Sequence, residues 1–370
     1  MRGFLQKLLL LSVSMIAIFF VLEIGVRIFL RQSSTLIEDD PYIVKKHKEN
    51  LDLRIAADTE KLSHIRTNSY GFIGDEWEMK KDATTSRIAN LGDSFTAGHD
   101  VDYDKNFSAI LAGELSGKIG EKVESLNFGV PGQGSGHALL TYRHYAAQFM
   151  PDTVILWFYM GNDFEDNLIF EEGSAKAGGG GGPLVKRIAR KSQLAHFIVN
   201  RLAKNPAVAN FMHGRVLTRV GYDITAETHN VPLALRLIFT NDKENDRALL
   251  ETKRLLDLLR QEVGAGGGKL LIAAIPANFQ VEENLKDDLF SQYPGLDELG
   301  FDAARPGREL KEIASELDLP YIDLTPAFKE ACQEKCTLYV CPHCHLSEDG
   351  HALLAEEVGK AVLERGLIPR

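Results

Sequence analysis

The strongest constraint on the fold is an almost uninterrupted apolar run over residues 153–158, which lies between Pro151 and Gly161. A run of this length and composition is typical of a parallel strand that is buried on both faces. Four other short apolar segments each end at turn residues and alternate with helix-like patterns. The five predicted strands cover residues 87–91, 123–128, 153–158, 269–275 and 321–323. Strands that alternate with helices require crossover connections, so we predict an α/β fold: a three-layer α/β/α sandwich with a five-stranded, parallel, flavodoxin-like sheet.

The helices expected between these strands have apolar positions at helical spacing. They cover residues 106–115, 137–149, 246–263 and 307–317, and a last helix begins after Ser347 and continues to about Glu364. The stretch 164–245 breaks the alternation, because it is acidic at first, then rich in glycine, then basic. We predict that residues 86–370 form one domain and that 164–245 is a helical insertion, with a lid as one option.

The N-terminus differs from this domain. Residues 8–22 carry no charge, Arg2 and Lys7 precede them, and the apolar pattern continues to Leu30. We predict a transmembrane anchor over residues 1–31, in contact with the membrane through residues 4–30, and an irregular stalk and lead-in over 32–85. A cleaved signal peptide is the alternative, although no cleavage site of the A-x-A kind follows. The expected location is the inner or plasma membrane, as a single-pass protein with its domain on the periplasmic side.

The net charge of the chain indicates which kinds of molecule it can bind. Acidic residues outnumber basic ones, 52 against 42, and the formal net charge is -10. A nucleic-acid-binding protein usually has the opposite sign, so we expect no nucleic-acid partner. The apolar fraction of 44% excludes a disordered chain.

All four cysteines lie within thirteen residues, at Cys332, Cys336, Cys341 and Cys344. An even number of clustered cysteines on an exported chain favours one or two disulfides. A zinc site and free thiols are the alternatives. We therefore predict disulfides and no metal.

Four side-chain and backbone groups with complementary chemistry follow predicted strands or precede the last helix. Ser94, Gly129 and Asn162 follow the first three strands, and His345 lies just before the last helix. Ligands of open parallel sheets bind beyond the carboxyl ends of the strands. A serine nucleophile, a histidine base and donors for an oxyanion together suit acyl transfer.

The motifs around these residues resemble those of the SGNH (GDSL-type) hydrolases. They are the segments 92–96 (Gly-Asp-Ser-Phe-Thr), 127–129 (Asn-Phe-Gly), 161–163 (Gly-Asn-Asp) and 345–351 (His-Leu-Ser-Glu-Asp-Gly-His), in the order of the family. Residues 65–72 also look like the lead-in of membrane-anchored, extracytoplasmic bacterial members. The resemblance implies that Ser94 is the nucleophile and His345 the base. It also implies that the Ser94 N–H, the Gly129 N–H and the Asn162 side chain bind the oxyanion, without a cofactor.

One position departs from the family pattern. The family usually places an aspartate two or three residues before its histidine, where this chain has His343 and Pro342. Three explanations stay open: a Ser–His dyad oriented by a backbone carbonyl, a carboxylate from elsewhere such as Asp323, or a site that binds without catalysing. Disulfides around the histidine loop could partly replace the missing orienting group.

These observations predict a serine esterase that acts, through an acyl-serine intermediate, on O-acyl esters of envelope or exported carbohydrate, foremost O-acetyl esters. An O-acyltransferase with the same site and an inactive carbohydrate-binding module are the alternatives. Polysaccharide-modification machinery of the envelope is the expected protein partner.

Overall fold

The computed structural model describes residues 2–29, 36–56, 62–170, 231–333, 335–340 and 345–369, together with the single residues 192, 194 and 198. The central sheet is built from β5 (Ser86–Gly92), β6 (Val123–Asn127), β7 (Thr153–Tyr159), β8 (Lys269–Ile275) and β9 (Tyr321–Asp323). Its strands are parallel and follow the order β6-β5-β7-β8-β9. The predicted α/β fold with five parallel strands is confirmed, and each strand lies within two residues of its predicted bounds.

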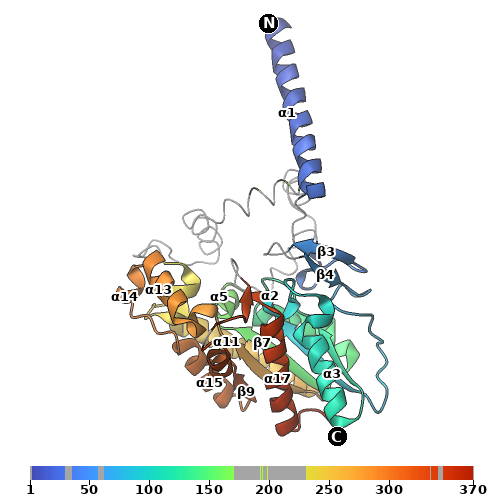
Figure 1. The fold of residues 1–370 in the computed structure, drawn as a ribbon, viewed down its shortest axis with the longest axis vertical. Coiled ribbons are helices and arrows are strands. Elements are labelled where there is room, and N and C mark those ends of the chain that lie inside the picture. Colours follow the sequence, from blue (N-terminus) through green and yellow to red (C-terminus); the bar gives the residue numbers. More distant parts are fainter. Residues whose placement is uncertain are drawn as a thin grey trace.

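Side chains of each strand alternate between two separate cores, because successive residues of a strand point to opposite faces. On β7, Ile155 and Trp157 pack with the core under α3 (Phe107–Ile119) and α17 (Glu348–Glu364). Val154, Leu156 and Phe158 belong to the other core. Figure 1 shows α3 and α17 side by side in front of the sheet.

The opposite face is covered by three helices that the sequence also predicted. They are α4 (Ser135–His144), α11 (Asn245–Ala265) and α15 (Arg305–Glu316). Side-chain caps fix two helix starts: Asn106 accepts a bond from the Ser108 N–H, and Ser347 accepts one from the Gly350 N–H. The other described short elements are α2 (Ser94–Ala97), η2 (Tyr103–Lys105), η3 (Ala146–Phe149), α5 (Asp163–Ile169), α10 (Leu233–Phe239), α12 (Asn278–Val281), α13 (Glu283–Gln292), α14 (Gly295–Glu298), α16 (Thr325–Ala331), β10 (Tyr339–Val340) and β11 (His345–Leu346).

The lead-in differs from the irregular stalk expected for it. It forms two antiparallel hairpins, β1 (Ile37–Asp40) with β2 (Val44–His47), and β3 (Asp52–Ala56) with β4 (Leu62–Arg66). Ile43 and Phe72 from this segment are fully buried in the core that contains α4. The sequence of this segment is largely polar, and its few apolar residues are buried only in tertiary contacts: Ile43 and Phe72 in the core of the sheet domain, and Leu36, Ile55, Ile65 and Ile73 in a small core of the lead-in itself.

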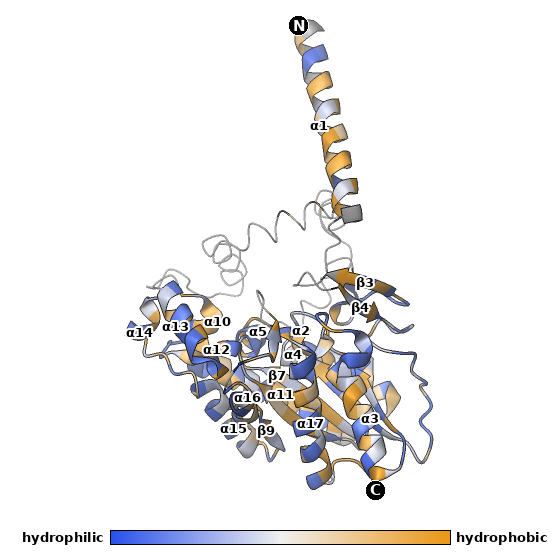
Figure 2. Cartoon of the chain, viewed as in Figure 1, coloured by the Kyte–Doolittle hydropathy of each residue, from blue (hydrophilic) through white to orange (hydrophobic). Residues whose placement is uncertain are grey.

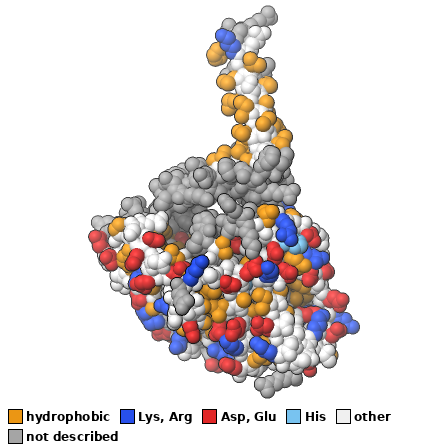
Figure 3. Space-filling model, in the orientation of Figure 1, with side chains coloured by type: hydrophobic (Ala, Val, Ile, Leu, Met, Phe, Trp, Pro, Cys, Tyr) orange, Lys and Arg blue, Asp and Glu red, His pale blue; other side chains and the backbone are white. Residues whose placement is uncertain are grey.

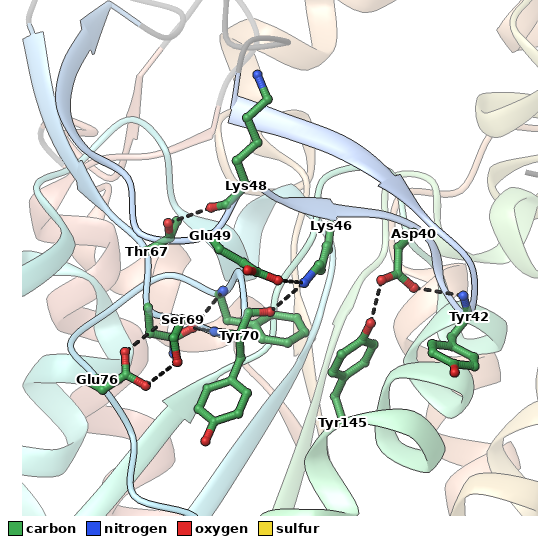
Figure 4. Close-up of polar contacts among 12 residues, drawn as sticks. Asp40, Tyr42, Lys46, Lys48, Glu49, Thr67, Ser69, Tyr70, Glu76 and Tyr145 are labelled. Carbon is green, nitrogen blue, oxygen red and sulfur yellow. Dashed lines mark hydrogen bonds and ion pairs between the residues drawn. The ribbon is translucent and has the colours of Figure 1, made fainter. Parts of the chain in front are cut away.

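Polar contacts tie the lead-in to that domain (Figure 4). The Tyr145 hydroxyl, just after α4, donates to the Asp40 carboxylate at the end of β1. Within the lead-in, Lys46 Nζ lies 2.7 Å from Glu49 Oε1 and 3.1 Å from the Tyr70 carbonyl oxygen. The amide of Gln133 donates to the carbonyl oxygens of Ile43 and Lys45 at 3.0 Å each. The β1–β2 hairpin is therefore attached by side chains of the sheet domain.

The N-terminal helix α1 (Arg2–Phe29) extends away from the domain (Figure 1), and its surface is largely hydrophobic (Figures 2 and 3). Within the described residues, no helix combines the length and apolar character needed to cross a membrane, in contrast to the predicted anchor over residues 1–31. Of the predicted insertion 164–245, the structure describes mainly its two ends, including α10. The glycine-rich stretch and the lid that we considered lie outside the described residues.

Candidate active site

Ser94 lies at the first position of α2, directly after β5. The chain can turn so tightly here because Gly92 has no side chain: a Cβ at Gly92 would come within 2.9 Å of the Trp157 carbonyl oxygen. Asp93 caps the helix, and its carboxylate accepts the Phe95 N–H at 2.8 Å. The strand, the glycine and the cap therefore place Ser94 at the carboxyl edge of the sheet, as predicted.

His345 contacts both Ser94 and a carboxylate. Its Nε2 lies 3.0 Å from Ser94 Oγ, and its Nδ1 lies 3.0 Å from Asp100 Oδ2. The Asp100 side chain is only 2% exposed, and the His345 side chain is 23% exposed. Serine, histidine and aspartate thus form a continuous line of contacts, with the histidine open to solvent on one side.

Asp100 is the residue that the sequence analysis missed. It follows Ser94 by six positions, whereas the family pattern directs attention to the residues just before the histidine. The helix α2 ends after about one turn at Gly98, whose φ of 65° is a left-handed conformation that favours glycine. The chain then folds back, and Asp100 comes against the His345 ring. One sequence signal could have indicated Asp100: a glycine shortly after the nucleophile that can end the helix there, followed closely by an acidic residue.

Asp323, the carboxylate that we considered in place of the missing aspartate, lies elsewhere. Its Oδ1 accepts the Thr325 N–H at 2.9 Å at the end of β9. With Met160, Lys311 and other residues it lines a cavity of about 520 Å³. The explanations by Asp323 and by a backbone carbonyl are therefore replaced by Asp100. The usual position before His345 holds no aspartate, and of the three explanations the carboxylate from elsewhere agrees with the structure, although it is Asp100 and not Asp323 that contacts His345.

The two other predicted oxyanion donors follow β6 and β7. The Gly129 N–H donates to Asn127 Oδ1 at 2.9 Å, and a Cβ at Gly129 would lie 2.4 Å from the Ala97 nitrogen. Gly129 is therefore required for close packing of its loop against α2. Asn162 Nδ2 donates one hydrogen to Asp166 Oδ2 at 3.1 Å. Its second hydrogen is available to a ligand, because an amide nitrogen carries two. Their role in binding an oxyanion stays a prediction.

Burial changes the ionisation of the carboxyls beside the nucleophile. Desolvation raises the pKa of Asp93 to about 6, although its bond from Phe95 and the nearby His345 act against the shift. Desolvation, and then the charge of Asp93, raise the pKa of Asp163 well above its usual value. Low polarity around the site therefore favours neutral forms, and this strengthens any hydrogen bond formed there.

The loop before His345 is only partly described. Cys332 and Cys336 form a disulfide, which agrees with the predicted oxidation. Cys341, Pro342, His343 and Cys344 lie outside the described residues. Among the described residues, no group of three or more His, Cys, Asp or Glu side chains is arranged to hold a metal ion.

His351, in the first turns of α17, is fully buried and has a structural role. Its ring stacks on Phe107, with the ring centroids 5.8 Å apart, and its Nδ1 accepts the Phe107 N–H at 3.3 Å.

Comparisons with known proteins place the chain in a family. The model of the GDSL-like lipase/acylhydrolase family matches residues 91–353, more than two thirds of the chain. Among solved structures, an acetylxylan esterase from Geobacillus stearothermophilus is 14% identical with a TM-score of 0.41, over 76% of this chain and 96% of that one. A lipase/acylhydrolase from Enterococcus faecalis is 15% identical with a TM-score of 0.40, also over 76% and 96%. No curated protein matches the sequence. On the family match, this chain belongs to the GDSL-like lipases and acylhydrolases, the SGNH hydrolases, which are serine ester hydrolases.

Proposed function

We propose that this protein hydrolyses acyl esters through an acyl-serine intermediate, with Ser94 as nucleophile, His345 as general base and acid, and Asp100 as the residue that orients the histidine. The observation that carries the proposal is the line of contacts from Ser94 Oγ through both ring nitrogens of His345 to Asp100, each contact 3.0 Å long. Such a line is the arrangement that activates a serine hydroxyl.

In the first step, Ser94 Oγ attacks the ester carbonyl carbon while its proton passes to His345 Nε2. The carbonyl oxygen becomes an oxyanion, which the N–H groups of Ser94 and Gly129 and the amide of Asn162 would stabilise. The intermediate then collapses: the bond from carbon to the alcohol oxygen breaks, and His345 returns the proton to that oxygen. Water repeats the same steps on the acyl-serine and releases the acid. The Gly129 N–H must turn from Asn127 to the oxyanion, or be shared between them, for this role.

Asp100 sets the tautomer of the base. A carboxylate acceptor at Nδ1 keeps the hydrogen on that nitrogen, so the lone pair of Nε2 faces Ser94. The same carboxylate stabilises the imidazolium that forms during attack. Because Asp100 is nearly inaccessible to water, both effects act in a medium of low polarity.

The finer proposal is that the ester is an O-acyl group, foremost O-acetyl, on carbohydrate of the cell envelope or on exported carbohydrate. Its support is the group of polar side chains near Asn162, among them Asp166, which accepts a hydrogen bond from the Asn162 amide. A subsite rich in charged and amide groups suits hydroxyl-bearing alcohols better than long acyl chains.

Removal of the nucleophile tests the function. Hydrolysis of 4-nitrophenyl acetate by Ser94→Ala should fall by about 10⁴-fold or more, the scale seen when a serine nucleophile is removed. The matched control is the exposed Ser315→Ala on α15, which should keep the wild-type rate. A rapid burst of 4-nitrophenol, seen only when Ser94 is present, would report the acyl-enzyme. An unchanged kcat in a folded Ser94→Ala protein would rule out this mechanism.

We also propose that the catalytic domain works outside the cytoplasm, at the membrane surface, where polysaccharide-modification machinery would be its partner. The disulfide and the exposed apolar surface of α1 support this location. Protease added to cells with a permeabilised outer layer should digest the domain. Protection from protease until the cells are lysed would contradict the proposal.

A further inference from the structure

A group of polar side chains near Asn162 contains several polar atoms that have no hydrogen-bond partner among the described residues. It comes from three segments: Lys45 on β2, His137 on α4, and Asn162 and Asp166 at the start of α5. Neither the general chemistry of ester hydrolysis nor the contacts of Ser94, His345 and Asp100 use the first two residues. We call these four residues the lead-in subsite, because Lys45, the one lysine among them, comes from the lead-in.

Lys45 brings a positive charge to the site. Its Nζ would lie 3.3 Å from a Cβ placed on Gly132, in the loop that follows Gly129. Within the described part of the chain, the ammonium has no direct hydrogen bond or ion pair, although Asp166 is near enough to act on it electrostatically. Burial lowers the pKa of Lys45, and Asp166 partly offsets this effect. A half-buried ammonium without a bonded acceptor among the described residues has three donors to offer.

The polar groups near Lys45 also have hydrogen-bond donors and acceptors that are not paired. Asn162 Oδ1 and His137 Nδ1 are buried and, among the described residues, have no hydrogen-bond partner. Burial, followed by the charge of Lys45, lowers the pKa of His137 to about 4, so its ring is neutral at pH 7 and offers one donor and one acceptor. Desolvation raises the pKa of Asp166 to about 7.

These positions are held rigidly. A Cβ on Gly134 would lie 2.7 Å from the Asp166 Cβ, so the loop before α4 packs directly on α5. The His137 ring contacts the ring of Phe170 with centroids 5.1 Å apart. Gln133 bonds to the carbonyl oxygen of Lys45 and so fixes the hairpin on the same loop. The subsite is therefore in place before any ligand arrives.

The chemistry selects the ligand. A hydroxyl both donates and accepts, so a single hydroxyl can bridge the ammonium of Lys45 and the carboxylate of Asp166. A further hydroxyl can donate to Asn162 Oδ1. The carboxyls of Asp166 and Glu165, whose pKa values burial raises to about 7, partly offset the charge of Lys45 near pH 7, so a neutral ligand is favoured over an anionic one. An alkyl chain would leave the polar groups of the subsite unpaired.

We propose that the lead-in subsite binds hydroxyl groups of the alcohol part of the ester, so that the substrate is an acylated sugar and the N-terminal lead-in is part of its binding site. This rests on the proposed esterase function. Asn162 connects the two sites, because one of its amide hydrogens bonds to Asp166 and the other is the one assigned to the oxyanion.

The test compares two acetate esters that each carry a CH2–O-acetyl group on a six-membered ring: methyl 6-O-acetyl-glucoside, and cyclohexylmethyl acetate, which lacks the hydroxyls, the methoxy group and the ring oxygen. Acetate release is measured with the full-length protein in detergent. Wild-type protein should favour the sugar ester in kcat/KM. Lys45→Met, which keeps the length of the side chain and removes the ammonium, should lower the ratio of the two kcat/KM values by about 10–100-fold, mainly through KM of the sugar ester.

The exposed Lys80→Met is the matched control and should leave the ratio unchanged. Equal values of kcat/KM for the two esters in wild-type protein, or an unchanged ratio in Lys45→Met, would overturn the proposal. A second experiment measures sugar binding without ester hydrolysis. Saturation-transfer NMR detects whether methyl glucoside binds to Ser94→Ala protein, with and without the Lys45→Met substitution. If that binding depends on Lys45 while no ester is hydrolysed, the subsite stands and the esterase function falls; if glucoside does not bind, the subsite falls.

Discussion

At the scale of single residues, the site depends on where the carboxylate of Asp100 comes from. A triad acid needs only to reach Nδ1 of the histidine, in an environment that keeps it ionised and oriented. In this chain Gly98 turns the backbone directly after α2. The Asp100 carboxylate therefore contacts His345 from the same segment that carries Ser94. The position that usually holds the acid is thereby free for a proline and a histidine.

Asp100→Asn tests this assignment. An amide can donate to Nδ1 and hold the hydrogen on Nε2, which leaves Ser94 without a base. We expect kcat to fall by about 10³–10⁴-fold with KM little changed, the scale known for the chymotrypsin type of triad. Kinetics on 4-nitrophenyl acetate provide the measurement, and the exposed Asp104→Asn is the matched control. A loss of less than tenfold would mean that another group orients His345.

At the scale of elements, the lead-in behaves as part of the catalytic domain. Phe72 is fully buried and meets the ring of Phe128 with centroids 4.9 Å apart. His47, on β2, lies with its Nε2 2.7 Å from Nε2 of His99, the residue before Asp100. Only one of these two nitrogens can carry the shared hydrogen in the neutral pair. The hairpin therefore supports the loop of the triad acid as well as the core.

Two truncations measure this contribution. A protein without residues 1–31 keeps both hairpins and should unfold at nearly the temperature of the full chain. A protein without residues 1–85 loses Phe72 and His47, and removal of one buried phenylalanine side chain alone costs about 3–5 kcal/mol. We expect it to be insoluble or to melt at least 10 °C lower in circular dichroism, as a loss of this size implies. Equal melting temperatures would show that the lead-in is a separate unit.

The disulfide Cys332–Cys336 has a simpler role than the sequence suggested. We expected disulfides to replace a missing orienting group, but Asp100 already orients His345. The double variant Cys332→Ser/Cys336→Ser should lose ~2 kcal/mol of stability, the chain-entropy value for so short a loop, while kcat at 25 °C stays within about twofold. Thermal unfolding and kinetics on the same sample decide this. A tenfold fall in kcat in a folded protein would restore the first interpretation.

At the scale of the whole molecule, the buried titratable groups couple stability to pH. Burial, and secondarily the nearby His345, lower the pKa of His351 to about 3, while Asp100 acts in the opposite direction. An unfolded histidine has a pKa of about 6.5, so between these values the unfolded chain binds more protons. Stability therefore falls as pH decreases from about 6.5 towards 3, by up to about 1.4 kcal/mol per pH unit for this residue. Glu165 and Asp166, whose pKa values burial raises to about 7, have the opposite effect, since stability falls as pH rises towards 7.

His351→Asn isolates the first effect. Its free energy of unfolding should change less between pH 6.5 and pH 4 than that of the wild type, because no buried histidine must then be kept neutral. Denaturant unfolding at a series of pH values provides the measurement, with His144→Asn, a partly exposed histidine, as the control. Parallel curves for wild type and His351→Asn would show that other groups set the acid sensitivity.

The sequence by itself determined the elements of the sheet domain, because their signals are local. Apolar runs with their bounding turns gave the five strands, and a serine cap gave the start of α17. The positions of Ser94, Asn162 and His345 followed, since each lies at the end of a strand or directly before a helix. The tertiary structure decided the rest. Asp100, the His47–His99 pair and the place of Lys45 depend on which loops meet in space, and a contact between distant loops leaves no periodic pattern in the chain.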